Sequence, residues 1–313
     1  MTSRQTRKVA AEVRRIREAR EHVVRALAAK PNIRGTMIGL RVRDGIVADD
    51  EVCLTALVDR KVEPQALAGK HRIPRSVAHK SGDVHLDVLQ VKGLRPQSAP
   101  FSDGAIGIRV GPQIGTISAF CRAPSAVYAL TCHHVIASAE QPMSVPIEAW
   151  SDAQHEWIRI GRTAASIPNS MPGQPGDFGF SDAALILVEH PALLAEAGAA
   201  QPIQAAQAVL GEPLQGDGAV RKMRNGQVIG VETIFDGFPA DLFVQVSSPG
   251  TYAGDSGMLW KDSAGRAVAI HGFAEPAGPG EGSTITASMW ATRAVAKLQA
   301  ILNQPIQILS EPH

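Results

Sequence analysis

Short apolar segments separated by glycine- and proline-rich turns fill the chain from residue 106 onward, and this pattern most restricts the fold. The segments are 106–110, 115–120, 127–131, 157–160, 183–188, 227–233, 242–247, 258–261, 267–271 and 283–288. A helical pattern over about 291–303 follows the last of them. Many short strands before one C-terminal helix predict a mainly β domain of barrel type.

The first 30 residues have a different period. Apolar residues recur at helical spacing over about 4–29, at Val9, Val13, Ile16, Val23 and Leu27. The opposite face is basic, with Arg14, Arg15, Arg17, Arg20 and Arg25. We expect a helix that packs on its own domain with a solvated basic face. The alternative is a helix that binds a partner or an anionic surface.

Three further strands are predicted before residue 95, over 37–42, 52–58 and 84–88. Together with the helix they make a small α+β domain, and the segment 96–100, with its two prolines, is the best candidate for a linker. The sequence therefore predicts an N-terminal domain of residues 1–98 and a second domain of residues 99–313.

Charge and cysteine content exclude several classes of protein. A net charge of +1 gives no field that favours nucleic acid, and no apolar run is long enough to span a membrane. A turn around 123–125 would place Cys121 opposite residue 126 or 127 and leave Cys132 out of register, so Cys53, Cys121 and Cys132 are expected to be free, buried thiols. With no signal-peptide pattern, this favours the cytoplasm. No residue spacing predicts a metal site or a cofactor.

Three motifs carry the chemistry. His133-His134 follows the segment 127–131, Asp182 begins Asp-Ala-Ala-Leu-Ile and directly precedes the segment 183–188, and Ser256 lies in Gly254-Asp255-Ser256-Gly257. A serine hydroxyl is a weak nucleophile and needs an adjacent base that a carboxylate orients. Histidine, aspartate and serine occur here in one of the chain orders known for such triads.

These motifs resemble those of chymotrypsin-like serine peptidases, over about residues 104–303. The resemblance implies a double β-barrel and a catalytic triad of His134, Asp182 and Ser256, with the N–H groups of Gly254 and Ser256 as the oxyanion hole. His134 matches the family position better than His133. Asp177, in Pro-Gly-Asp-Phe-Gly, is the alternative to Asp182 but is more typical of a turn.

By the same resemblance, Gly250 lies at the floor of the primary (P1) specificity pocket, which disfavours cleavage after Arg or Lys. Thr251 and His271 match positions that bind an acidic side chain in glutamyl-specific relatives, so an acidic P1 preference is one hypothesis. The alternative is that His271 is only a satisfied residue of the barrel. In zymogen-type relatives a freed N-terminus pairs with the residue at Asp255, but no corresponding activation sequence is present here.

The sequence thus predicts a cytoplasmic serine endopeptidase that acts on proteins or peptides through an acyl-enzyme. A catalytically inactive or latent fold that acts as a binding module is the alternative. An esterase on another fold is disfavoured, because Gly254–Gly257 is not a Gly-x-Ser-x-Gly elbow and the histidine precedes the serine. The oligomeric state is left open.

Overall fold

A computed structural model of the chain describes residues 3–43, 45–97, 99–100, 107–137, 146–151, 154–170, 180–219, 223–278 and 281–310. The helices are α1 (Ser3–Leu27), α2 (His133–Ile136), α3 (Pro191–Ala199) and α4 (Ala291–Leu302), with 3-10 turns at Pro64–Ala66 and Gly69–His71. The strands up to the first histidine motif are β1 (Ile33–Arg43), β2 (Ile46–Val58), β3 (Ser76–Val77), β4 (Val84–Gln90), β5 (Arg95–Pro96), β6 (Ala99–Pro100), β7 (Ile108–Val110), β8 (Gln113–Gly115), β9 (Ala119–Arg122) and β10 (Val127–Thr131). Those that follow are β11 (Ile147–Ser151), β12 (Glu156–Ser170), β13 (Ser181–Val188), β14 (Pro213–Asp217), β15 (Met223–Phe235), β16 (Phe238–Val246), β17 (Leu259–Lys261), β18 (Ala267–Ala274), β19 (Ile285–Trp290) and β20 (Gln307–Ile308).

Six of the later strands close into a barrel. Their pairing order is β14-β17-β18-β19-β16-β15, and β15 pairs again with β14, so the ring has no free edge. Trp260 and Phe243, among the largest fully buried side chains, come from strands of this ring. The closed ring confirms the predicted barrel in the C-terminal half of the chain.

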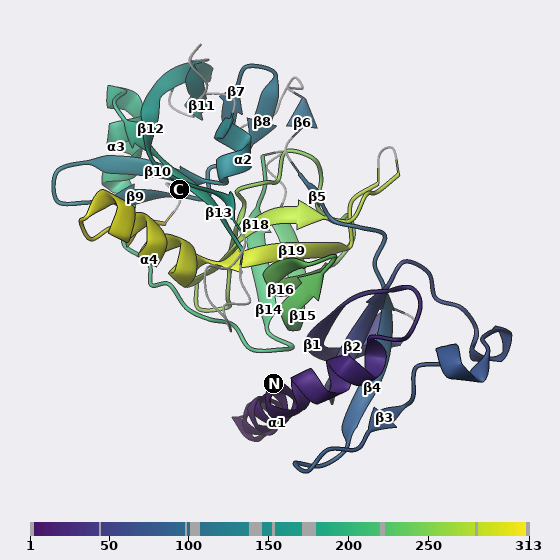
Figure 1. Ribbon diagram of the computed structural model, residues 1–313. Helices are drawn as coiled ribbons and strands as arrows, with labels where there is room; N and C mark the ends of the chain where they lie inside the picture. The colour runs from purple at the N-terminus through teal and green to yellow at the C-terminus, as the bar shows by residue number, and fades with distance from the viewer. Residues whose placement is uncertain are drawn as a thin grey trace.

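The other strands of the β-rich part form a nine-stranded sheet in the order β20-β9-β10-β13-β12-β11-β7-β8-β6. The prediction of a mainly β fold with a C-terminal helix is confirmed, because α4 follows β19 and packs on β12, β13 and β18 (Figure 1). Lys297 of α4 donates to the hydroxyl of Ser181 at 2.7 Å, which fixes the helix beside the start of β13.

The N-terminal strands continue the barrel sheet. β1 pairs antiparallel with β15, and β2, β4 and β3 follow in the same sheet. α1 packs on β1, β2 and β4, and its apolar face is buried, as predicted (Figure 1). One hydrophobic cluster contains Ile16 of α1 together with Val228 and Trp260 of the barrel, so the two regions share a core. The division of the chain at residue 98 stays a prediction.

Several arginines on the basic face of α1 bind groups of the same chain. Arg20 is only 6% exposed, and its Nη1 lies 3.5 Å from the carboxylate of Glu232 on β15. Arg17 binds the same carboxylate. Arg15 donates to the carbonyl of Asp83 at 2.6 Å. The expectation of a solvated basic face is therefore wrong for Arg20, which is buried, whereas Arg17 is 54% exposed and still forms an ion pair with the same chain.

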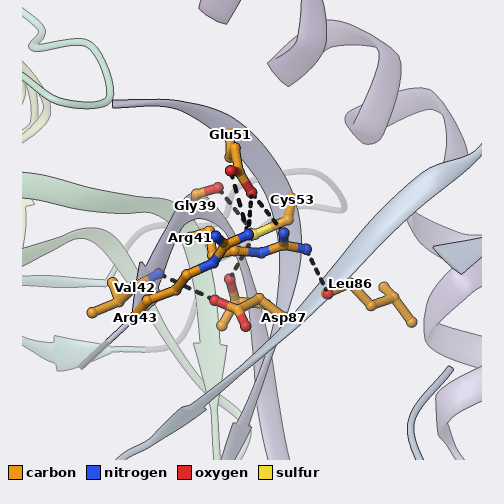
Figure 2. Close-up of polar contacts among 9 residues, drawn as sticks. Gly39, Arg41, Val42, Arg43, Glu51, Cys53, Leu86 and Asp87 are labelled. Carbon is orange, nitrogen blue, oxygen red and sulfur yellow. Dashed lines mark hydrogen bonds and ion pairs between the residues drawn. The ribbon is translucent and has the colours of Figure 1, made fainter. Parts of the chain in front are cut away.

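A polar network stabilises the β1–β2 hairpin where its register shifts between Leu40 and Arg41 (Figure 2). Arg41 binds Glu51 at 2.6 Å, and the carboxylate of Asp87 accepts the backbone N–H of Val42 at 3.2 Å. The buried thiol of Cys53 donates to the carbonyl of Gly39 at 3.5 Å. Side chains thus satisfy backbone groups near the irregularity, as buried polar atoms require.

Several sequence expectations need correction. The predicted linker 96–100 instead contributes to the short strands β5 and β6, which pair with the two sheets. The predicted strand 115–120 is divided, because β8 ends at Gly115 and β9 begins at Ala119. Cys121 pairs with Tyr128, one residue beyond the predicted partner. The prediction that the three cysteines are free and buried is confirmed. No described helix is long and apolar enough to cross a membrane.

The close approach of β1 to β15 gives a test of the shared core. A Cβ added to Gly35 would lie 1.8 Å from the carbonyl oxygen of Ile234. We expect Gly35→Ala to lower the free energy of unfolding by about 1–3 kcal/mol, since the backbone must shift. Denaturant unfolding measures this, with Gly69→Ala as the control because a Cβ there meets nothing within 4 Å. Equal stability of the two variants would contradict the tight β1–β15 contact.

Candidate active site

The two sheets bring His134, Asp182 and Ser256 together. β10 and β13 pair antiparallel, so His134, which follows β10 in α2, lies beside Asp182 on β13. The Nδ1 atom of His134 bonds to the Asp182 carboxylate, which also accepts the backbone N–H of His134 at 2.9 Å. The Nε2 atom of His134 lies 2.7 Å from the hydroxyl oxygen of Ser256. Asp182 is fully buried, whereas the His134 side chain is 15% exposed.

The geometry distinguishes the alternatives of the sequence analysis. His134, not its neighbour His133, makes the bonds to both Asp182 and Ser256. The other aspartate considered, Asp177, lies outside the described residues. The three residues that the motifs predicted are therefore the ones in mutual contact.

The loop that carries Ser256 connects β16 to β17 and is fixed by bonds to the nine-stranded side. Thr116 donates its N–H to the carbonyl of Ser256 at 2.7 Å and its hydroxyl to the carbonyl of Gly254 at 2.9 Å. Gly254 has a φ of +105°, which favours glycine. At Gly257 a Cβ would lie 2.0 Å from the carbonyl oxygen of Thr116, so a larger residue would force the loop away.

The residue before the serine is held by an internal cation. The Nε atom of Arg224 lies 3.1 Å from the carboxylate of Asp255, and both side chains are fully buried. Asp255 also accepts the backbone N–H of Tyr252 at 2.9 Å. Burial raises the pKa of the Asp255 carboxyl, and the charge and hydrogen bond of Arg224 oppose that rise. Arg224 on β15 therefore supplies the positive charge that a freed N-terminus would supply in a zymogen.

A segment of the chain itself lies across the site. Arg95 and Pro96 pair antiparallel with Ala274 and Phe273 of β18, on the barrel side. Two residues beyond Gln97, the backbone of β6 pairs antiparallel with β8 of the nine-stranded sheet. The described residues on either side of Gln97 thus pair with different sheets, and Gln97 stands beside Ser256.

The backbone of Gln97 is bonded to the predicted oxyanion donors. Its carbonyl oxygen accepts the N–H of Gly254 and the N–H of Ser256, the latter at 3.5 Å. Its own N–H faces the carbonyl of Gly272 at 3.3 Å and the hydroxyl of Ser256 at 3.0 Å. Gly254 and Ser256 therefore do direct their amides at one carbonyl oxygen, as the oxyanion arrangement requires.

The side chain of Gln97 fills a buried pocket. Its Oε1 lies 2.9 Å from Nε2 of His271, and its Nε2 donates to the hydroxyl oxygen of Ser283 at 3.1 Å. The Ser283 hydroxyl in turn donates to the carbonyl of Glu275. Burial lowers the pKa of the His271 imidazole to about 3, and the nearby charges of His134 and Arg224 add to the effect. His271 is therefore neutral at ordinary pH.

The other two predicted pocket residues, Gly250 and Thr251, lie next to Ser283, which binds the Gln97 side chain. Thr251 is fully buried and pairs through its backbone with Ser283, and its hydroxyl faces the Ser283 carbonyl at 3.5 Å. A Cβ on Gly250 would lie within 3 Å of Gly282 and Ser283 backbone atoms. His271 thus contacts the Gln97 side chain directly, whereas the backbone of Gly250 and Thr251 lies against the segment that carries Ser283.

A metal ion does not suit the donor atoms at this site. Among the described residues, the candidate cluster is Cys132, His134 and Asp182. Burial raises the pKa of the Cys132 thiol well above its ordinary value, and this thiol donates to the carbonyl of His271 at 3.2 Å. His134 and Asp182 already bind each other. Thiolate is the form that metals bind, so the cluster is better described as part of the triad.

The closed six-stranded ring, the nine-stranded sheet and the C-terminal helix α4 make a mainly β fold of barrel type. No family model and no curated protein matches the sequence. A glutamic-acid-specific serine protease, described as using a histidine triad in substrate binding, is 17% identical with a TM-score of 0.42, over 66% of this chain and 98% of that one. Thermobifida fusca Protease A is 14% identical with a TM-score of 0.40, over 66% and 97% of the two chains.

The HtrA-type protease AlgW with a bound decapeptide is 17% identical with a TM-score of 0.39, over 61% of this chain and 50% of that one. These likenesses concern the fold. What this chain does is inferred from its own site.

Sequence analysis missed three residues of the site. Gln97 lay in a presumed linker, and neither its type nor its neighbours indicated a bound segment. Ser283 lies in an ordinary Gly-Ser pair, and Arg224 is one arginine among many. Only pairing between distant strands brings them to Ser256, so the local sequence contains no signal for them.

The buried ion pair gives a second prediction. Arg224→Leu leaves the Asp255 carboxylate buried without its cation, and we expect a loss of about 3–5 kcal/mol in the free energy of unfolding. Arg162→Leu is the control, since its pair with Glu189 is 77% and 53% exposed and such pairs contribute below about 1 kcal/mol. Denaturant unfolding compares them. A loss below about 1 kcal/mol for Arg224→Leu would show that the pair does not hold the loop.

His271 gives a pH-dependent prediction. Its folded pKa of about 3 lies below the unfolded value near 6.5, so between these pH values the unfolded state binds a proton that the folded state does not. The free energy of unfolding therefore falls as pH falls through this window, by about 1.4 kcal/mol per pH unit. In His271→Gln this contribution is absent, and denaturant unfolding from pH 6 to pH 4 should show a shallower slope. Parallel profiles for the two proteins would contradict a neutral His271.

Proposed function

We propose that this chain is a serine endopeptidase in which His134, Asp182 and Ser256 form the catalytic triad. One observation carries the proposal: the hydroxyl of Ser256 bonds to His134 while a peptide carbonyl accepts the N–H groups of Gly254 and Ser256. Nucleophile, base and oxyanion donors thus act on the same carbonyl group, which is the geometry that acyl transfer needs.

Each residue has a defined task. Ser256 attacks the carbonyl carbon and passes its proton to Nε2 of His134, and Asp182 holds the imidazole orientation and stabilises the imidazolium. The amides of Gly254 and Ser256 stabilise the oxyanion, and His134 then gives the proton to the leaving amine. Water hydrolyses the acyl-enzyme by the same route in reverse.

The peptide-bond specificity is supported by the cleft. Strand pairing on both sides of Gln97 offers backbone hydrogen bonds that an extended polypeptide fills, whereas a small ester would leave them unused. A non-catalytic binding module, the alternative class, would not require a histidine bonded to both Asp182 and Ser256.

The triad is tested by covalent labelling with a fluorophosphonate probe. Because the chain's own segment covers Ser256, both the wild type and Gln97→Ala are treated, and the variant should label faster since it lacks the side-chain bonds to His271 and Ser283. We expect no labelling of Ser256→Ala and a loss of about 10⁴-fold or more for His134→Ala. His133→Ala is the matched control and should label near the wild-type rate.

Folded wild type and Gln97→Ala that both resist the probe would contradict the proposal and favour the binding module. Loss of labelling in His133→Ala but not in His134→Ala would reassign the base.

The hydrogen-bonding groups around the Gln97 side chain bear on the hypothesis of an acidic P1 residue. A neutral His271 can donate one hydrogen bond to a carboxylate oxygen but brings no positive charge. The Ser283 hydroxyl donates its proton to the carbonyl oxygen of Glu275, so it has none for the second carboxylate oxygen. We therefore favour glutamine over glutamate at P1. The test uses the Gln97→Ala variant and two peptides that differ only at P1, one with glutamine and one with glutamate. We expect kcat/KM to be about 10- to 100-fold higher for the glutamine peptide, because glutamate would leave a buried polar group unsatisfied. Equal or faster cleavage after glutamate would restore the acidic hypothesis.

A further inference from the structure

The chain presents a segment of its own to the proposed active site in the pose of a substrate. Arg95 and Pro96 pair with β18 before the reacting carbonyl, and Ala99 and Pro100 pair with β8 after it. Between these pairs the Gln97 carbonyl accepts both oxyanion amides, and the Gln97 side chain, 8% exposed, occupies the pocket. Residues 95–97 and 99–100 therefore engage the oxyanion amides, the side-chain partners His271 and Ser283, and one strand of each sheet.

We propose that this chain cleaves its own peptide bond between Gln97 and Ser98, in cis, with a pocket that selects the carboxamide of Gln97. The proposal rests on the proposed serine endopeptidase function and names a substrate for it.

The pocket's hydrogen-bond pattern matches a carboxamide. With its proton directed at the Glu275 carbonyl, the Ser283 hydroxyl oxygen can only accept, and it accepts from the Gln97 N–H₂ group. His271, neutral, has an Nε2–H to donate to the Gln97 carbonyl oxygen. The His271 N–H thus donates to the Gln97 carbonyl oxygen, and the Ser283 oxygen accepts from the Gln97 N–H₂ group. A glutamate carboxylate would place a lone pair against the Ser283 lone pair.

The reaction consumes one water. The Ser256 oxygen forms an ester with the Gln97 carbonyl carbon while its proton moves to His134, and the bond from that carbon to the Ser98 nitrogen breaks as His134 protonates the nitrogen. Water then attacks the ester with His134 as base, which frees the Ser256 hydroxyl. The products are a Gln97 carboxylate and a new amino terminus at Ser98.

The two fragments should stay associated after the cut. Residues before the cut are held by the β1–β15 pairing and by the core that α1 shares with the barrel. The new amino terminus is not needed to pair with Asp255, because Arg224 already does so. Cleavage is therefore expected to alter how residues 95–100 cover the cleft, while the loop with the oxyanion donors is already formed before the cut.

The test uses the full-length protein, purified as wild type, Ser256→Ala, Gln97→Ala, Gln97→Glu and the control Gln65→Ala, in which an exposed glutamine is changed. Intact-mass spectrometry under denaturing conditions follows conversion to fragments 1–97 and 98–313, and N-terminal sequencing identifies Ser98. The fluorophosphonate probe is applied to the same samples.

We expect wild type and Gln65→Ala to convert with a first-order rate that dilution does not change, and the fragments to co-elute until denatured. Ser256→Ala stays intact. Gln97→Glu is cleaved about 10- to 100-fold more slowly. Gln97→Ala is also cleaved more slowly yet labels faster than wild type, because losing the side-chain bonds slows cleavage but opens the cleft. A residue with a merely structural role would not shift the two rates in opposite directions.

Wild type that labels but stays intact, cleavage at another bond, a rate that depends on concentration, or cleavage of Ser256→Ala each overturns self-cleavage while leaving the proposed function standing. Neither labelling nor cleavage, in folded wild type and in folded Gln97→Ala, overturns both.

Discussion

The buried ion pair between Arg224 and Asp255 holds the loop that carries Gly254 and Ser256, the proposed oxyanion donors and nucleophile. Ser256 directly follows Asp255, whose buried carboxylate binds Arg224 of β15 and the backbone N–H of Tyr252 within the same loop. A buried carboxylate without a cation would strongly destabilise the folded protein. The loop therefore needs the Arg224 side chain to keep the Asp255 carboxylate buried. Because the cation belongs to a strand of the barrel, the loop is formed without a freed amino terminus.

The cleft follows from how the two sheets meet. Ser256 and the pocket residues come from the barrel, whereas His134 and Asp182 come from the nine-stranded sheet, and Thr116 bonds the serine loop to that second sheet. Beyond the part of β18 that pairs with β17, Phe273 and Ala274 pair with β5, and β8 pairs with β6, so the backbone on either side of Gln97 bonds to both sheets. Unpaired edges are open to further strands, so the cleft favours extended polypeptide.

Local sequence accounted well for the elements and for three of the site residues. Helical spacing over 4–29 corresponds to Ser3–Leu27, and the short apolar segment 127–131 is β10 as predicted. His134, Asp182 and Ser256 were found because each lies in a short motif with a chemical purpose. The linker at 96–100 was misassigned, since prolines break regular patterns and a strand of two residues has no periodicity to detect.

The sequence by itself determined a mainly β chain with a histidine, an aspartate and a glycine-flanked serine in triad order, because periodicity and motifs are properties of neighbouring residues. Only the tertiary structure decided what occupies the cleft and what the pocket can bind. The contacts of Gln97 with His271, Ser283 and Gly254 join residues more than 150 positions apart. The role of the Ser283 hydroxyl also depends on the folded structure. It donates its proton to the carbonyl oxygen of Glu275, so its oxygen is left to accept, and no property of residue 283 alone fixes that choice.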